Sequence, residues 1–298
     1  MIINQIILNS KINYFNMKKI LILGSRGQIG SHLLNFLKNK NYKTYEFDLI
    51  NNKSEDLRIN SNHKFLSYVK KADFVFFLAF DVGGSVYLKR YQNSYNFLMN
   101  NISIMKNTFE VLYAEKKKFI FATSQMSNMI YSSYGILKRI GEDITKSLGG
   151  ISVRFWNVYG IEEDMEKSHV ITDFITKALK KKIIHMLTNG NEERDFLYAD
   201  DCCRGLEIVM KKYDIFKNKN IIDLSYGGYT KIIKVADIIK NLFKTKGINV
   251  KVIRGKKNDQ LQKNKRNVPN TYLKKYWKPK FSLEQGIKEV FNFYFKKN

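Results

Sequence analysis

Short apolar runs alternate with amphipathic stretches over the first half of the chain. The apolar runs cover residues 20–23, 43–47, 73–80, 118–123 and 151–155, and helical spacing covers residues 31–39, 95–114 and 134–148. The run at 73–80 is apolar throughout after its first residue, which is typical of a parallel strand buried on both faces. Strands that alternate with helices in this way predict an α/β fold with a doubly wound parallel sheet.

The pattern becomes less regular after about residue 160. Helical spacing returns at residues 170–182, 232–243 and 283–294, one more apolar run lies at 221–224, and the Lys/Asn-rich residues 254–267 predict a loop. Because the first strand follows Met17, we interpret residues 1–16 as an N-terminal extension. They have neither the charged start nor the cleavage site of a signal peptide.

Composition narrows the classes of protein. With 298 residues, of which 44% are hydrophobic, the chain can bury one large core or two interlocked ones. Its two cysteines, Cys202 and Cys203, are adjacent and cannot form an ordinary disulfide framework, so we expect a cytoplasmic location. No run of about 18 apolar residues predicts a membrane span. The four histidines are scattered without zinc spacing, so we expect no metal.

The formal net charge of +25 first suggests nucleic acid as a partner. The lysines, however, are spread along the whole chain and are not confined to one element. We therefore favour a bias toward Lys on solvated faces and expect no nucleic-acid partner. The excess charge can still steer an anionic substrate toward the protein.

A glycine-rich turn follows the first strand and opens the first helix. Gly24, Gly27 and Gly30 have the Gly-x-x-Gly-x-x-Gly spacing that lets a backbone approach a pyrophosphate at a helix N-terminus. The predicted cofactor contacts from this turn are Gly24, Arg26, Gly27, Gln28, Ile29 and Gly30.

Asp48 ends the second strand, 18 residues past Gly30, where a carboxylate accepts the adenosine ribose hydroxyls. A carboxylate there repels a 2′-phosphate, so NAD is favoured over NADP; Arg26 leaves NADP open, since it can pair with such a phosphate. Further predicted cofactor contacts are Asp56 and Leu57 at the adenine, and Leu78, Ala79 and Phe80 after the third strand.

Tyr134 and Lys138 lie four residues apart on a predicted helix and so share one face. A cation beside a phenol favours the phenolate, so Lys138 is expected to lower the pKa of Tyr134. Ser124 follows a predicted strand, at the edge of the sheet where α/β proteins bind ligands. The three residues predict proton transfer at a carbinol oxygen. With 18 Tyr and many Lys in the chain, one such pair can also arise by chance.

Together these segments resemble the extended short-chain dehydrogenase/reductases, the nucleotide-sugar epimerase and dehydratase group. The motifs that carry the resemblance are the glycine turn, Asp48, Asn101 with Asn107, Ser124, Tyr134 with Lys138, residues 154–160, residues 194–201 and residues 277–279. The resemblance implies an NAD(P)-binding Rossmann domain, a smaller C-terminal lobe for a nucleoside-diphosphate sugar, Asn101 as a cofactor contact, and a homodimer through two long helices. It assigns residues 17–165 and about 196–225 to the first domain, and residues 166–195 and 226–298 to the lobe.

The two residues after Ser124 bear on the reaction. Relatives that dehydrate or epimerise carry acid or base groups there, whereas this chain has Gln125 and Met126, which cannot move a proton at neutral pH. Hydride transfer at one carbinol, C4 of the sugar, is what remains. Net oxidation, net reduction and 4-epimerisation with recycled NAD stay open, as does a non-catalytic dinucleotide-binding protein.

Two stretches are similar to GDP-fucose synthase: residues 82–84 and residues 168–171. They imply a GDP-linked manno-configured hexose or heptose, used in surface-polysaccharide sugar biosynthesis. The substrate contacts expected from the resemblance are Gly83, Gly84, Asn157, His169, Val170, Arg194 and Arg254, with Asn157 and both arginines at the diphosphate, where an arginine fork fits.

Overall fold

The computed structural model describes residues 18–259 and 267–297. The whole predicted extension at 1–16 and the centre of the predicted loop at 254–267 therefore lie outside the described residues. No helix in the described ranges is both long and apolar enough to cross a membrane.

A six-stranded parallel sheet forms the centre of the larger part of the molecule. Its strands, in spatial order, are β2 (Lys43–Phe47), β1 (Lys19–Leu23), β3 (Phe74–Phe77), β4 (Phe119–Ser124), β5 (Ile151–Phe155) and β9 (Ile221–Leu224). The chain passes from β1 to β2 on one side and then crosses to β3 on the other, so the direction of winding changes at β1. Ligands bind at the carboxyl ends of strands beside such a switch point.

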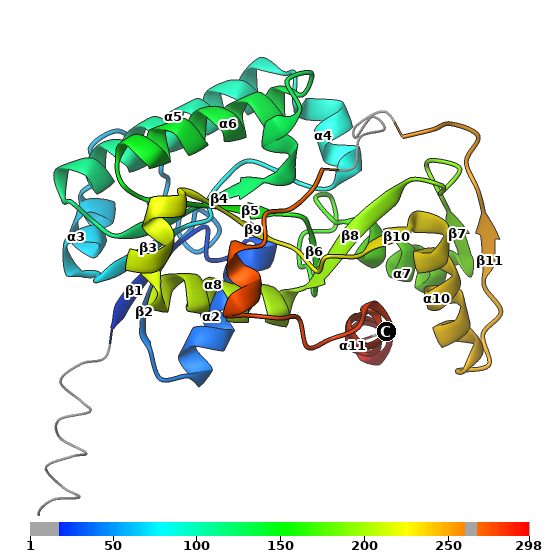
Figure 1. Cartoon of the computed structure of the whole chain (residues 1–298). Helices are drawn as coiled ribbons and strands as arrows, with labels where there is room; N and C mark the ends of the chain where they lie inside the picture. The colour runs from blue at the N-terminus through cyan, green and yellow to red at the C-terminus, as the bar shows by residue number, and fades with distance from the viewer. Residues whose placement is uncertain (1–17, 260–266, 298) are drawn as a thin grey trace, which may run out of the picture.

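Helices cover both faces of this sheet (Figure 1). One face carries α3 (His63–Lys71), α5 (Tyr95–Ala114) and α6 (Ser133–Ser147), and the other carries α2 (Gln28–Asn39) and α8 (Ala199–Lys211). Along β1, Leu21 and Leu23 pack against the face that carries α3, α5 and α6, while Ile20 and Ile22 pack against the face that carries α2 and α8. Side chains alternate between the two faces in this way along any strand. The predicted α/β class with a doubly wound parallel sheet is confirmed.

The smaller part has a core of its own, built from α7 (Val170–Lys181), α10 (Ile232–Lys244) and α11 (Leu283–Lys297). Two small sheets join it. One contains β10 (Tyr229–Lys231), β8 (Glu193–Tyr198) and β6 (Asn157–Tyr159), and the other pairs β11 (Lys251–Ile253) with β7 (Ile183–His185). The predicted smaller C-terminal lobe is thus present.

Short elements complete the chain: α4 (Ser85–Tyr91), α9 (Tyr213–Phe216), and the 3-10 turns η1 (Gln125–Asn128), η2 (Lys217–Lys219) and η3 (Tyr272–Lys275). Leu273 and Trp277 pack in the core of the large sheet, although the predicted boundaries place them in the lobe. The strand β8 pairs within the small sheet, although residues from 196 onward were expected in the Rossmann domain. The division into domains therefore stays a proposal.

Candidate active site

A cavity of about 640 Å³ opens at the carboxyl ends of the central strands and is lined by residues of both parts of the molecule. Most of the predicted site residues line it: Gly24, Arg26, Gly27, Gln28, Ile29, Gly30, Asp48, Asp56, Leu57, Leu78, Ala79, Phe80, Gly83, Gly84, Ser124, Tyr134, Lys138, Asn157, His169 and Arg194. Asn101, Val170 and Arg254 do not line this cavity.

The glycine turn joins β1 to α2 and has the form that a pyrophosphate site requires. Gly24 has a φ of 82°, and a Cβ on Gly30 would lie 2.0 Å from the carbonyl oxygen of Gly24, so neither position accepts a side chain. No side chain caps α2, which leaves the amides of its first turn open toward the cavity. The buried side-chain nitrogen of Gln28, Nε2, also has no protein partner within the described ranges. These features fit a bound dinucleotide.

Asp48 lies beside this turn. Its carboxylate accepts hydrogen bonds from the backbone amides of Arg26 at 2.8 Å and of Ile50 at 2.9 Å. The guanidinium of Arg26 turns outward: it donates to Asn51 and lies 3.6 Å from the carboxylate of Glu46. Glu46 also pairs with Lys38 at 2.7 Å, so the surface beside Asp48 carries two cations and two carboxylates.

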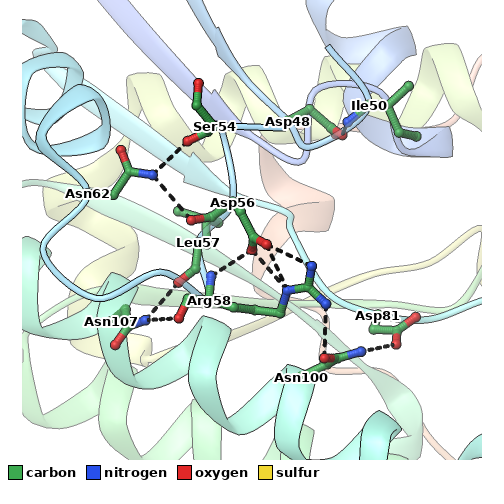
Figure 2. Close-up of polar contacts among 10 residues, drawn as sticks. All are labelled: Asp48, Ile50, Ser54, Asp56, Leu57, Arg58, Asn62, Asp81, Asn100 and Asn107. Atoms are coloured by element: carbon green, nitrogen blue, oxygen red, sulfur yellow. Dashed lines mark hydrogen bonds and ion pairs between the residues drawn. The ribbon is translucent and has the colours of Figure 1, made fainter. Parts of the chain in front are cut away.

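A series of polar contacts follows beside Asp56, in the loop after β2 (Figure 2). The guanidinium of Arg58 holds both oxygens of Asp56 and donates to Asn100 at 3.1 Å. Asn100 donates to Asp81 at 3.1 Å, and Asp81 also accepts from the Tyr87 hydroxyl and pairs with Lys167 at 3.1 Å. The hydrogen bonds from Arg58 hold the pKa of Asp56 below its usual value.

Arg58, Asn100, Asp81 and Lys167 all line the cavity and are missing from the predicted site. Asp81 was the one with a usable signal, since it is the first charged residue after the apolar run at 73–80. These polar contacts link the loop after β2 to a segment of the smaller lobe.

Asn101 holds a loop and does not reach the cofactor side of the cavity. It is buried, its side-chain oxygen accepts from the Asp81 amide at 2.7 Å, and its nitrogen donates to the carbonyls of Asp81 and Phe97. Its neighbour in the pattern, Asn107, donates to the carbonyls of Leu57 and Arg58, each at 2.9 Å. Both asparagines therefore anchor cavity-lining loops to α5, and Asn101 as a cofactor contact stays a prediction.

Ser124, Tyr134 and Lys138 converge on the cavity from β4 and α6. Ser124 is the last residue of β4; its hydroxyl accepts from the Met126 amide at 3.2 Å and interacts with the Tyr134 phenol, whose pKa it lowers. Ser132 caps α6 through the Gly135 amide and so fixes the first turn, which carries Tyr134. Lys138 donates to the carbonyl oxygen of Ala122 at 2.7 Å.

The protonation of this group differs from the prediction. Burial raises the pKa of Tyr134 to about 12, and the hydrogen bond from Ser124 only partly opposes it. Lys138 does not lower that value, because its nitrogen lies 5.8 Å from the centre of the Tyr134 ring and 3.5 Å from that of Phe80. Burial also lowers the pKa of Lys138, against the charge of Glu142. In the protein by itself, Tyr134 is therefore a protonated phenol.

His169 faces the other half of the cavity. Its Nδ1 lies 2.6 Å from one carboxylate oxygen of Glu162, and its backbone amide donates to the other oxygen at 3.0 Å. Burial lowers the pKa of His169, but the charge and hydrogen bond of Glu162 outweigh it, so the net shift is upward. Val170 begins α7 directly behind it. The Gly84 amide donates to the carbonyl of Lys167 at 2.9 Å, which brings the loop after β3 against this segment.

The residues expected at the diphosphate are not all together. Arg194 lines the cavity and pairs with Asp259, and Asn157 donates to the carbonyl of Asp195 at 3.3 Å. Arg254 instead bonds to Asn189 and Asn191, away from the cavity lining. The expected second phosphate contact is therefore not part of this cavity.

A glycine turn at a switch point and a Ser–Tyr–Lys group in one cavity define an oxidoreductase of the short-chain dehydrogenase/reductase type. Comparison with known proteins agrees. The family model for the "NAD dependent epimerase/dehydratase family" matches residues 20–224, and the chain belongs to this family. The predicted class, an NAD(P)-dependent nucleotide-sugar reductase or epimerase, is thereby confirmed.

Individual relatives extend over nearly the whole chain. A putative UDP-glucose 4-epimerase of Methanocaldococcus jannaschii is 29% identical, covering 92% of this chain and 97% of that protein. Two solved structures from Campylobacter jejuni share the fold. A GDP-6-OMe-4-keto-L-xylo-heptose reductase has a TM-score of 0.79 at 18% identity, covering 94% and 98% of the two chains. A GDP-mannoheptose C4 reductase with NADP bound has a TM-score of 0.74 at 20% identity, covering 93% and 98%.

Proposed function

We propose that this protein is an NAD-dependent oxidoreductase acting at C4 of a nucleoside-diphosphate sugar, a GDP-linked manno-configured hexose or heptose, in surface-polysaccharide sugar biosynthesis. The observation that carries the proposal is the convergence of Ser124, Tyr134 and Lys138 at the wall of a cavity that also contains the glycine turn. The two Campylobacter reductases, whose names specify GDP-linked heptoses, support the sugar class.

The chemistry needs a small set of side chains. When bound, the nicotinamide supplies or accepts the hydride. Ser124 donates a hydrogen bond to the C4 oxygen and orients it toward Tyr134. Tyr134 transfers a proton to or from that oxygen, and since its raised pKa keeps the phenol protonated at neutral pH, it holds a proton that it can donate to a ketone. Lys138, whose ammonium donates to the carbonyl of Ala122, would also donate to a hydroxyl of the nicotinamide ribose. We therefore favour net reduction.

The residues beside Ser124 support this choice over dehydration. Gln125 and Met126 are both buried against the cavity, and neither titrates near neutral pH. A 4-epimerase that recycles its cofactor is the second candidate, favoured by the Methanocaldococcus relative. The two candidates differ in whether added cofactor is consumed.

For the cofactor we propose NAD before NADP. The support is Asp48, whose carboxylate would repel a 2′-phosphate bound beside the glycine turn; Glu46 adds a second carboxylate, which pairs with both Arg26 and Lys38. The NADP bound to one Campylobacter neighbour argues the other way for that protein. Titration of the protein with NADH and NADPH, followed by the fluorescence of the reduced nicotinamide, decides between them; tighter NADPH binding would contradict the proposal.

We also propose a homodimer through α5 and α6. These helices lie side by side on the outer face of the sheet (Figure 1), and they expose Met99, Ile102, Ile136 and Ile140 by 40 to 46%. Light scattering coupled to gel filtration tests the state. Ile140→Glu should yield monomers, while Ile215→Glu, at an exposed position on α9, should not.

The central experiment is Tyr134→Phe assayed with GDP-, UDP- and dTDP-sugars, with NMR identification of products with and without added NAD(H). Loss of the proton-transfer group should lower kcat about 100- to 10,000-fold and leave the affinity for NADH within twofold. Tyr113→Phe, at a position that is 70% exposed, is the matched control. Unchanged turnover by the Tyr134 variant would remove this residue from the reaction.

A further inference from the structure

Gln125 occupies a position that the proposed chemistry does not use. It directly follows Ser124, begins η1, and lines the cavity while only 6% of its surface is exposed. A buried carboxamide at the wall of a sugar site has two polar ends, and both need hydrogen-bond partners.

One end is taken by Asn267, which comes from a segment 142 residues further along the chain. The side-chain nitrogen of Asn267 donates to the backbone carbonyl of Gln125 at 3.0 Å and also to its side-chain oxygen. A backbone carbonyl can only accept a hydrogen bond, so Asn267 must present its nitrogen here. Only the oxygen of the Gln125 carboxamide can then face Asn267, and its nitrogen is turned the other way.

The other end of Gln125 has no partner in the part of the chain that the structure describes, residues 18–259 and 267–297. The nitrogen is also absent from the wholly buried polar atoms that lack a partner in those ranges, so it keeps an open surface. Gln125 lines the cavity next to Ser124, so the cavity is the open space at this position to which the nitrogen can donate.

Asn270 fixes the segment that carries Asn267. Its backbone amide donates to Asp223 at 2.9 Å, and its side chain donates to Asp223 at 2.8 Å and to the carbonyl of Ile221 at 3.2 Å. Asp223 is in turn held by the indole nitrogen of Trp156 at 3.0 Å. The segment is therefore anchored to the end of β9, and Asn267 approaches Gln125 from a fixed direction.

We infer that Gln125 is a substrate-binding residue whose carboxamide N–H donates to a sugar oxygen next to the reacting carbon, and that Asn267 is the positioning residue that sets its orientation. The inference rests on the proposed nucleotide-sugar function. It assigns to this position a neutral hydrogen-bond donor for a hydroxyl-bearing sugar carbon. A sugar with a deoxy carbon there would leave the N–H unpaired.

The test compares ligands with and without the sugar. Calorimetry on the full-length, NAD-saturated protein gives the Kd of GDP and GDP-mannose, and of UDP and UDP-glucose. In each pair, the Kd of the bare diphosphate divided by the Kd of the sugar nucleotide measures the contribution of the sugar alone. Gln125→Met, which keeps length but removes the donor, should lower this ratio about 3- to 10-fold in the pair that wild type prefers, with the Kd of the bare diphosphate unchanged.

Asn267→Ala should lower the same ratio by a smaller factor, and the double variant should fall no further than Gln125→Met, because Asn267 acts through Gln125. Asn258→Ala is the matched control, because Asn258 is exposed and pairs with the side chain of Asn189; it should leave the ratio within twofold. Thermal melting and NADH titration of each variant report whether the fold and the cofactor half are intact.

An unchanged ratio in Gln125→Met would overturn the assignment of Gln125. Additive losses in the double variant, or an equal loss in Asn258→Ala, would overturn the role of Asn267. If wild type discriminates neither sugar nucleotide from its diphosphate, the nucleotide-sugar proposal fails and takes this inference with it; a wild type that discriminates, with variants that do so equally, contradicts this inference alone.

Discussion

A buried ion pair supports α6, the helix that carries Tyr134 and Lys138. Glu142 lies one turn after Lys138 on α6, and its side chain is 1% exposed. It accepts two hydrogen bonds from the guanidinium of Arg154, each 2.7 Å long, and a third from Thr123 at 2.9 Å. The pair therefore joins α6 to β5 and β4, the elements that position Lys138 and Ser124.

Removing one partner should be costly. Glu142→Leu leaves the Arg154 guanidinium, 12% exposed, without its carboxylate. Loss of one member of a buried pair typically costs about 3 to 5 kcal/mol, which corresponds to a fall in Tm on the order of 10 °C for a chain of this size. Replacing both members, as Glu142→Leu with Arg154→Met, should recover most of this loss, because two apolar side chains need no charge partner.

Thermal melting followed by circular dichroism measures these changes. The matched control is Arg139–Asp143, an i,i+4 pair on the same helix with side chains that are 54% and 66% exposed. Asp143→Leu should alter stability by about 0.5 kcal/mol or less. The reasoning would be refuted by a cost below about 1 kcal/mol for Glu142→Leu, or by a double variant no more stable than the single one.

Three further outcomes are expected. Burial opposes the ionisation of Glu162, but pairing with His169 outweighs it and lowers the pKa of Glu162; the same pairing raises the pKa of His169. The pair therefore stabilises the fold fully between about pH 4.5 and 6.5, and this contribution is lost as pH rises through the raised pKa of His169 or falls through the lowered pKa of Glu162. The Tm difference between wild type and Glu162→Gln should thus be largest in that window and shrink on either side of it; a constant difference would contradict the pairing. Asp81→Ala removes the acceptor shared by Lys167, Tyr87 and Asn100, and should lower the free energy of unfolding by about 1 to 3 kcal/mol in thermal melting. An unchanged stability would mean that these hydrogen bonds are not formed. Asp48→Ser should narrow the NADH-over-NADPH preference at least fivefold in fluorescence titration, and an unchanged preference would exclude Asp48 from that choice.

The fold could be predicted because its signals are local. Buried parallel strands are continuous apolar runs, and β2, α5 and β5 begin and end at the predicted residues. The strand predicted at 73–80 ends at Phe77 instead, since Leu78, Ala79 and Phe80 are apolar for a different reason: they line the cavity. Apolar character reports burial, and burial against a ligand site has the same sequence signal as burial in a sheet.

The helix α8 is missing from the predicted elements although its signal is present. Cys202, Cys203, Leu206, Val209 and Met210 have helical spacing and are all buried in the core of the large sheet. The motif at 194–201 overlaps the first turn of this helix, and its polar residues conceal the apolar spacing that follows. Two adjacent cysteines here are small core side chains, and burial raises the pKa of both thiols.

The two halves of the cavity differ in how far the sequence can describe them. The cofactor half comes from neighbouring strand–turn–helix units, so fixed spacings identify the glycine turn and Asp48. The substrate half is assembled from segments that are distant in sequence, as the contact between Gln125 and Asn267 shows. Spacing carries no information about such contacts. The same separation has a consequence for engineering: because the substrate half takes its shape from segments outside the dinucleotide-binding units, substitutions at Gln125, Asn267 or His169 should change the preferred sugar and leave cofactor affinity unaltered.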